Sequence, residues 1–170
     1  TGLRVGVAAA QGLAQGLGIG VLPLTSTAVL AQQAYDAGWD GPVVAVVDAR
    51  RNEVFCARYG GRAQEGCPPA RYLPEVLAAE LFADLAADRA ARPASSPVRP
   101  ILAVGNGARR YEALFSAAGV RVAASCDLSP RALVSLAADK LAHGAGPVPP
   151  AEVRPVYLRE ADARINWAHR

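Results

Sequence analysis

Apolar residues recur at intervals of three and four along the first part of the chain. This spacing predicts a helix over residues 2–17, with one face made by Leu3, Val7, Ala10, Ala14 and Leu17. Four glycines lie in the same stretch, namely Gly2, Gly6, Gly12 and Gly16. Each interior glycine costs a helix about 1 kcal/mol relative to alanine. Such a helix needs neighbours to hold it. The glycines would let those neighbours come close, either within the chain's own lobe or on another molecule.

The pattern then alternates between short apolar runs and helical segments. We expect a short strand over residues 21–24 and a second helix that begins at Thr25 or Ser26 and ends near Gly38. A run of β-branched residues over 42–49, a polar turn over 50–52 and a second strand over 53–60 predict a β-hairpin. A loop over 60–69, an alanine-rich helix over 73–91 and a surface linker follow.

The last part of the chain repeats the alternation. A strand over residues 101–107 ends in a glycine-rich turn and leads into a helix over 108–118 and a short strand over 120–123. Ser129 and Pro130 are typical of a helix start, and that helix should run to about residue 143. A strand-like segment over 153–158 and a polar tail complete the chain. This order predicts an α/β protein, with a lobe boundary near residues 38–41.

Composition narrows the class of protein only slightly. The chain has 170 residues, of which 52% are hydrophobic, and it carries a formal net charge of +3. Its basic residues are nearly all arginine, which indicates codon bias more than a nucleic-acid surface. Three cysteines without a C-x-x-C pair point to neither a disulfide framework nor a zinc site, and favour a reducing compartment. No apolar run approaches a membrane span, and the first residues lack the order of a signal peptide.

Two segments could carry chemistry. Gly105, Asn106 and Gly107 end a strand and open a helix, where backbone N–H groups can hold an anion, although such turns often use glycine for geometry alone. Asp48, Arg50, Arg51 and Glu53 surround one turn, and paired carboxylates can act in acid–base chemistry. A turn with cross-strand ion pairs is the commoner use of such residues. His143 and His169 are far apart in the sequence and suggest no metal site.

Several segments resemble the TsaB (YeaZ) family. They are TGLRVGVAAAQGLAQGLGIGVLPLTSTAVLAQQA near the start, the hairpin VVAVVDARRNEVFCARY, the turn AVGNGARRY and PVYLREADA near the end. The resemblance covers nearly the whole chain in the right order. It implies the actin-like (Hsp70-like) ATPase fold, which has two ribonuclease-H-like lobes. Residues 1–39 would then be the remnant of an N-terminal lobe whose first hairpin is missing, residues 40–158 a full C-terminal lobe, and residues 159–170 a tail. Without that hairpin, we expect the first helix to be exposed, displaced or paired with another molecule.

The resemblance also implies a function. The TsaB family supports TsaD, together with TsaE and TsaC, in making N6-threonylcarbamoyladenosine at position 37 of tRNA, and is regarded as a non-catalytic scaffold. ATP and metal are then expected on TsaD, tRNA contact only through the complex, and a cytoplasmic location without a membrane. The positions that match the metal histidines of TsaD are Ser26 and Leu30, so no metal site and no catalytic residue are expected in this chain.

The first two helices are the expected contact surface for TsaD, or for a second copy of the chain as a homodimer. The residues expected at this interface are Leu3, Val7, Ala10, Leu13, Ala14, Leu17, Ala31 and Ala34. Two other functions remain open: a free-standing enzyme of the same superfamily, either a metal-dependent peptidase or a nucleotide hydrolase, and a direct RNA-binding module.

Overall fold

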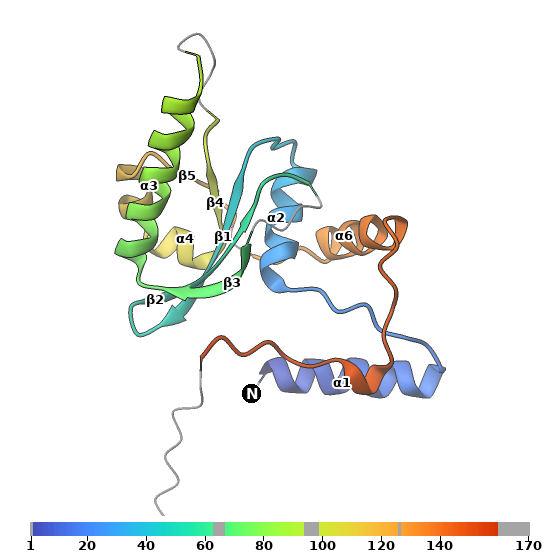
Figure 1. Ribbon diagram of the computed structural model, residues 1–170. Helices are drawn as coiled ribbons and strands as arrows, with labels where there is room; N and C mark the ends of the chain where they lie inside the picture. Colours follow the sequence, from blue (N-terminus) through green and yellow to red (C-terminus); the bar gives the residue numbers. More distant parts are fainter. Residues whose placement is uncertain (1, 63–66, 94–98, 126, 160–170) are drawn as a thin grey trace, which may run out of the picture.

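A five-stranded mixed sheet forms the centre of the computed structural model, which describes residues 2–62, 67–93, 99–125 and 127–159 (Figure 1). Its strands lie in the order β3-β2-β1-β4-β5. They are β1 (Val43–Arg50), β2 (Glu53–Tyr59), β3 (Cys67–Tyr72), β4 (Leu102–Val104) and β5 (Arg121–Val122). The three strands β1, β2 and β3 pair antiparallel, whereas β4 and β5 continue from β1 in parallel.

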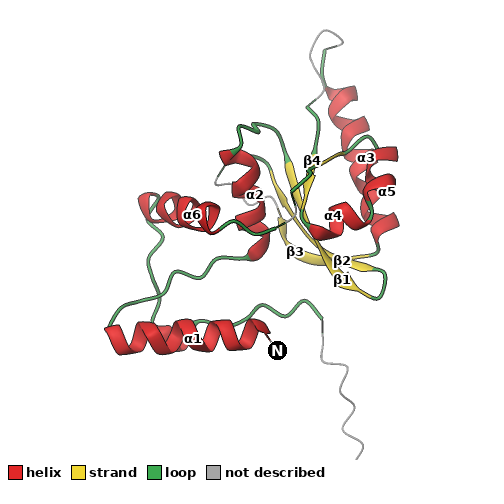
Figure 2. Ribbon diagram, turned by 180° about the vertical axis from the view of Figure 1, so that it is seen from behind, coloured by secondary structure: helices red, strands yellow, loops and turns green. Residues whose placement is uncertain are grey.

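Helices cover both faces of this sheet (Figures 1 and 2). On one face lie α2 (Ser26–Asp36) and α6 (Pro130–Ala142), and on the other α3 (Pro74–Ala91), α4 (Asn106–Arg110) and α5 (Glu112–Ala117). Alternate residues of β1 belong to different cores: Val43 packs with α2 and α6, and Val46 with α3 and α5. Because both faces are buried, β1 is a nearly continuous apolar run instead of an alternating one.

Local signals predicted several helix starts correctly. The Thr25 hydroxyl accepts a hydrogen bond from the Ala28 N–H at 3.2 Å and caps α2. The Ser129 hydroxyl likewise accepts from the Ala132 N–H at 3.4 Å, and Pro130 occupies the first turn of α6. The predicted hairpin is also confirmed, because Val46 of β1 faces Cys56 of β2 in register.

Four expected elements differ in the structure. Residues 21–24 form no strand and make only one bridge, between Val21 and Val148. The strand β3 begins at Cys67, within the loop expected over 60–69, because Pro68 and Pro69 indicated a loop there. An edge strand tolerates proline because its outer N–H groups need no partner. The helix expected over 108–118 breaks at Tyr111 into α4 and α5. Residues 153–158 run extended without pairing in the sheet.

The boundary expected near residues 38–41 does not separate packed units. Leu30 and Tyr35 of α2 lie in the same apolar core as Val43 and Val104 of the sheet. The helix α2 is therefore part of the body that residues 40–142 form, although the prediction grouped it with the first helix.

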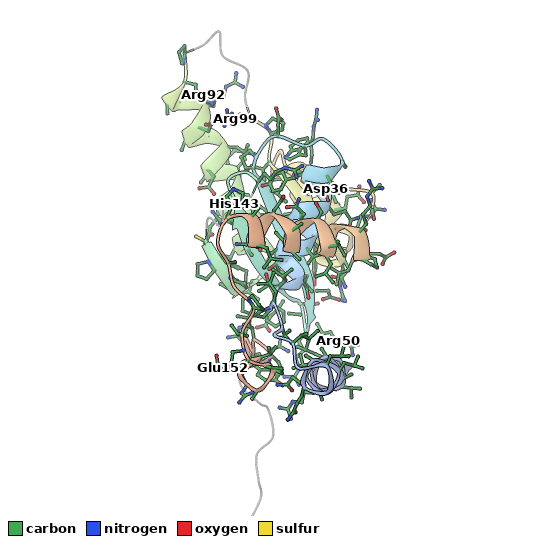
Figure 3. The ribbon with its side chains drawn as sticks, turned by 90° about the vertical axis from the view of Figure 1, so that its right-hand side faces the viewer. Asp36, Arg50, Arg92, Arg99, His143 and Glu152 are labelled. Carbon is green, nitrogen blue, oxygen red and sulfur yellow. The ribbon has the colours of Figure 1, made fainter. Side chains whose placement is uncertain are left out.

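The first helix stands apart from this body. In all three views α1 (Gly2–Leu17) lies beyond one end of the sheet, beside the short 3₁₀ helix η1 (Pro150–Glu152) and the chain that follows it (Figures 1, 2 and 3). Ala14 is its one buried residue. Leu13 and Leu17 are 69% and 71% exposed, so the expected exposure of this helix is confirmed.

Candidate functional site

The tip of the β1–β2 hairpin is joined to the glycine-rich turn that follows β4. The backbone N–H of Asp48 donates to the side-chain oxygen of Asn106 at 2.9 Å. The Asp48 carboxylate accepts from the Arg50 N–H through one oxygen and pairs with Arg110 at 2.9 Å through the other. The structure thus brings together two candidates that the sequence offered separately. Neither Asn106 nor Arg110 carried a local signal of this role.

The two glycines of this turn permit close contact with β1. A Cβ at Gly105 would lie 2.6 Å from the Val46 carbonyl oxygen, and one at Gly107 would lie 2.9 Å from the Asp48 nitrogen. Gly105 also has a φ of 103°, a conformation that other residues adopt only with strain. Geometry alone therefore explains both glycines, and the space where an anion would approach the turn from the β1 side is filled.

The hairpin tip has an unusual backbone. Arg50, Arg51 and Asn52 have φ values of 60°, 53° and 57°, so three successive non-glycine residues are left-handed. Arg50 faces Glu53 in register, which leaves Arg51 and Asn52 as a two-residue turn. Two-residue hairpin turns favour Asn-Gly when both central residues have positive φ. This hairpin instead has Arg51 at the first central position, where a left-handed conformation costs about 1–2 kcal/mol.

Converting the turn to Asn-Gly should stabilise the protein. The double substitution Arg51→Asn and Asn52→Gly relieves the left-handed strain, so we expect the free energy of unfolding to rise by about 1 kcal/mol. For a chain of this size that corresponds to an increase in Tm of about 2–4 °C, measurable by circular dichroism. An unchanged or lower Tm would show that the arginine at this turn makes contacts worth more than the strain.

Glu53 is the second carboxylate of the hairpin, and two arginines approach it. Arg71 of β3 lies 3.4 Å away, and Arg159 near the C-terminal end also pairs with it. Glu53 faces away from Asp48, because the two residues lie on opposite faces of the sheet. Val46 and Val54 pack in the same core. Side chains alternate along a strand, so Asp48, two residues after Val46, lies on that face, and Glu53, next to Val54, lies on the other. The two carboxylates therefore serve separate ion pairs, and the arrangement is that of a braced turn rather than an acid–base pair.

The two positions expected to match the metal histidines of TsaD lie on α2. Ser26 is exposed at its start, and Leu30 is 4% exposed in the core, near the turn at Gly105. Within the described ranges, no group of three or more His, Cys, Asp and Glu side chains is placed to hold a metal ion. His143 ends α6, where its ring lies 2.7 Å from the Asp139 carbonyl oxygen, and His169 lies outside the described residues.

The expected interface residues divide into three groups. Leu3, Ala10, Leu13 and Leu17 are exposed on α1. Val7 is half-buried and Ala14 is buried on the same helix. Ala31 and Ala34 are 1% and 8% exposed, because α2 is covered by the sheet and α6, so these two residues are removed from the exposed surface as a correction.

Two buried acids of the body have raised pKa values. Burial raises the pKa of the Cys56 thiol from 9.0 to about 12, and the nearby Arg58 offsets this only in part. Burial raises the pKa of the Tyr35 hydroxyl from 10.0 to about 12, with a further contribution from Tyr59. Cys56 and the exposed Cys67 are both free thiols, and Cys126 lies outside the described residues. Cys56 is therefore a packing residue and not a nucleophile.

Stability should fall as the pH rises above about 9. In the unfolded chain the Cys56 thiol loses its proton near its ordinary pKa of 9.0, whereas in the folded protein it keeps the proton to about pH 12. The unfolded state then binds fewer protons, so each pH unit between these limits costs on the order of 1 kcal/mol. Urea unfolding at pH 8, 9 and 10 should show this loss. The variant Cys56→Ala should lose less stability between pH 9 and 10, and an equal slope in both proteins would contradict the assignment.

Comparison with known proteins gives the class. Residues 1–167 match the model of the family described as "TsaD: tRNA N6-adenosine threonylcarbamoyltransferase", and the chain belongs to this family. Among curated relatives, it is similar to the tRNA threonylcarbamoyladenosine biosynthesis protein TsaB of Haemophilus influenzae. The two are 46% identical over 55 residues, which is 32% of this chain and 23% of that protein.

Two solved structures from Pseudomonas aeruginosa share the fold. One is YeaZ, at 27% identity and a TM-score of 0.71, and the other is a protein with similarity to peptidase YEAZ, at 29% identity and a TM-score of 0.72. The alignments cover 93% and 94% of this chain and 68% of each of those chains. The chain thus spans about two thirds of the length of these solved relatives. The stretch that matches the curated relative spans less than a quarter of that protein's length. In the part of the chain that the structure describes, no helix combines the length and the apolar character that crossing a bilayer requires.

Proposed function

We propose that the chain is a non-catalytic scaffold subunit that supports a TsaD transferase in threonylcarbamoyladenosine modification of tRNA. The observation that carries this proposal is the exposed apolar face of α1. Leu13 and Leu17 are more exposed than most leucines of a folded protein, and Leu3, at 57%, and Ala10 extend their stripe along the helix. An apolar helix face of this kind fits a helical partner, and the similarity to TsaB indicates TsaD as that partner.

The residues on α2 support a non-catalytic role for this chain beside a catalytic TsaD. Ser26 and Leu30 replace the histidines expected in TsaD, and leucine cannot bind a metal. Catalysis, ATP and metal then belong to TsaD, and TsaE and TsaC act in the same pathway in the cytoplasm. Contact with tRNA is made through the complex. The same lack of imidazoles weighs against a free-standing metal-dependent peptidase.

For the fold we propose a ribonuclease-H-like lobe of the actin-like ATPase group. The mixed five-stranded sheet with helices on both faces supports this assignment for residues 40–142, whereas the rest of the expected lobe, up to residue 158, runs beside α1. Helix α1 and the residues up to 39 would represent part of an N-terminal lobe, although α2 packs with the C-terminal one. In this arrangement the turn at Gly105 is a degenerate nucleotide loop whose space is taken by contact with β1.

Association with TsaD tests the function directly. Titration of the chain into the TsaD protein of the same genome should give saturable binding by calorimetry. A reaction reconstituted with TsaD, TsaE, TsaC, ATP and tRNA should depend on the chain, and the chain alone should give no modification. Modification or peptide cleavage by the chain alone, or full activity without it, would overturn the proposal.

The exposed helix face also predicts self-association. When TsaD is absent, two copies can bury the same α1 stripe around a two-fold axis, as is common for homodimers. Light scattering at increasing concentration should then report a dimer, and addition of TsaD should convert it to the mixed complex. A strictly monomeric chain at high concentration would contradict this part of the proposal.

A further inference from the structure

The C-terminal segment 147–159, called the strap below, runs beside α1 in the opposite direction (Figures 1 and 2). We infer that the strap keeps α1 helical and fixes its position, and that Gln11 and Arg159 are the positioning residues. The inference that the strap holds α1 in the free chain does not depend on any partner. The inference that α1 is held in this way to present a preformed surface to a partner rests on the proposed function.

Contacts between the strap and α1 proceed in antiparallel order. The segment after α1 meets the strap first, where Val21 and Val148 exchange two backbone hydrogen bonds of 2.9 and 2.8 Å. In the middle of the helix, the Gln11 side-chain amide donates to the carbonyl oxygens of Pro150 at 2.7 Å and Val153 at 3.2 Å. Figure 3, which looks along α1, places Glu152 of this turn beside the helix.

The first turn of α1 is held by the far part of the strap. The Arg4 side chain donates through Nε to the Tyr157 hydroxyl at 2.6 Å, and its guanidinium lies 5.3 Å from the centre of the same ring. Two residues later, Arg159 pairs with Glu53 at the start of β2. The strap therefore connects α1 to the hairpin of the body at one end and to the segment before α2 at the other.

The strap and the apolar stripe use different faces of α1. Arg4, Val7, Gln11 and Ala14 follow one another at steps of three and four, so they share the strap face. At about 100° per residue, Leu13 points about 160° away from Gln11 and Leu17 about 120° away, so both lie off the strap face. A bound strap thus leaves the exposed leucines available to a partner.

The composition of α1 explains why it needs the strap. Gly6 and Gly12 lie in the helix interior, and a Cβ at either would meet no atom within 4 Å, so close packing does not require them. The helix has no acidic residue in its first turn and no basic residue in its last, so its dipole receives no charged support there. A helix of 16 residues with this content is marginal in water and depends on tertiary contacts.

Hydrogen exchange of the full chain, read by mass spectrometry, tests the inference without any partner. The variants Gln11→Ala and Arg159→Gln should each raise exchange of the α1 amides by about fivefold to tenfold, because each removes an anchor of the strap. Exchange in β1 and the urea midpoint of the body should stay the same. Alanine favours helix more than glutamine does, so faster exchange in Gln11→Ala cannot come from propensity.

Three further variants isolate the mechanism. Arg71→Gln removes the other arginine from Glu53 but leaves the strap in place, so α1 exchange should not change. Arg159→Lys keeps the charge and should retain protection. Gly12→Ala added to Gln11→Ala should restore protection by strengthening the helix itself.

Other outcomes would overturn the inference. The first is that α1 exchanges in Gln11→Ala and Arg159→Gln at the same rate as in the natural chain. The second is that Arg71→Gln raises α1 exchange as much as Arg159→Gln does. The third is that the α1 amides are already unprotected in the natural chain. Because every reading is made on the free chain, failure of TsaD to bind would count against the proposed function only.

Discussion

Replacing Gly105 with alanine is expected to lower the free energy of unfolding by about 2 to 5 kcal/mol. The new methyl group would lie 2.6 Å from the Val46 carbonyl oxygen and 3.0 Å from the Leu30 side chain, and the oxygen belongs to a backbone that cannot move aside cheaply. The φ of 103° adds strain of its own. Urea unfolding followed by circular dichroism measures the loss, which is a large part of the stability of an ordinary domain.

Two companion variants test the cause. Gly107→Ala places a methyl group 2.9 Å from the Asp48 nitrogen and should also destabilise the body. Gly12→Ala is the matched control, because nothing lies within 4 Å of its added methyl group and the site is helical, so the urea midpoint should not fall. A Gly105→Ala protein as stable as the natural one would mean that the turn does not contact β1 in this way.

The substitution Leu13→Asp is expected to weaken association with TsaD by about 100-fold or more. Leu13 is 69% exposed in the free chain, so the charge costs little there. In a complex through α1 the carboxylate would be buried without a partner, which is strongly unfavourable. Calorimetry with the TsaD protein gives the affinity, and light scattering should show the same substitution turning a homodimer into a monomer.

Leu133→Asp provides the matched control for that experiment. Leu133 is 45% exposed on α6, so the same change of charge occurs on another exposed leucine. Its effect on TsaD binding should be within a few-fold. If Leu13→Asp and Leu133→Asp weakened binding equally, or if neither did, the contact surface would lie elsewhere.

Much of the fold could be predicted from local sequence because the signals concerned are themselves local. Thr25 and Ser129 cap helices within three residues, and the β1–β2 hairpin joins neighbouring runs. The elements that failed depend on distant residues. Val21 pairs with Val148, and β3 exists because β2 offers it an edge despite Pro68 and Pro69.

The candidate site, too, depends on contacts between residues that are distant in the sequence. The sequence indicates both Asp48 and the turn at Gly105 as candidates, but nothing in it indicates that Asn106 binds the Asp48 backbone, 58 residues away. Gln11 and Arg159 gave no signal either, since a glutamine in a helix and an arginine near a terminus are ordinary. Burial of Ala31 and Ala34 was missed because small residues suit both a partner interface and an internal helix–sheet contact.

The two edges of the sheet also bear on how copies of this chain can meet. An open edge invites another strand to add to it, which is a common route to aggregation. Here β3 carries two adjacent prolines, which have no N–H group to offer, and β5 is only two residues long. Growth of the sheet from molecule to molecule is therefore disfavoured at both sides. Concentrated solutions should resist fibre formation, and association should proceed through helices.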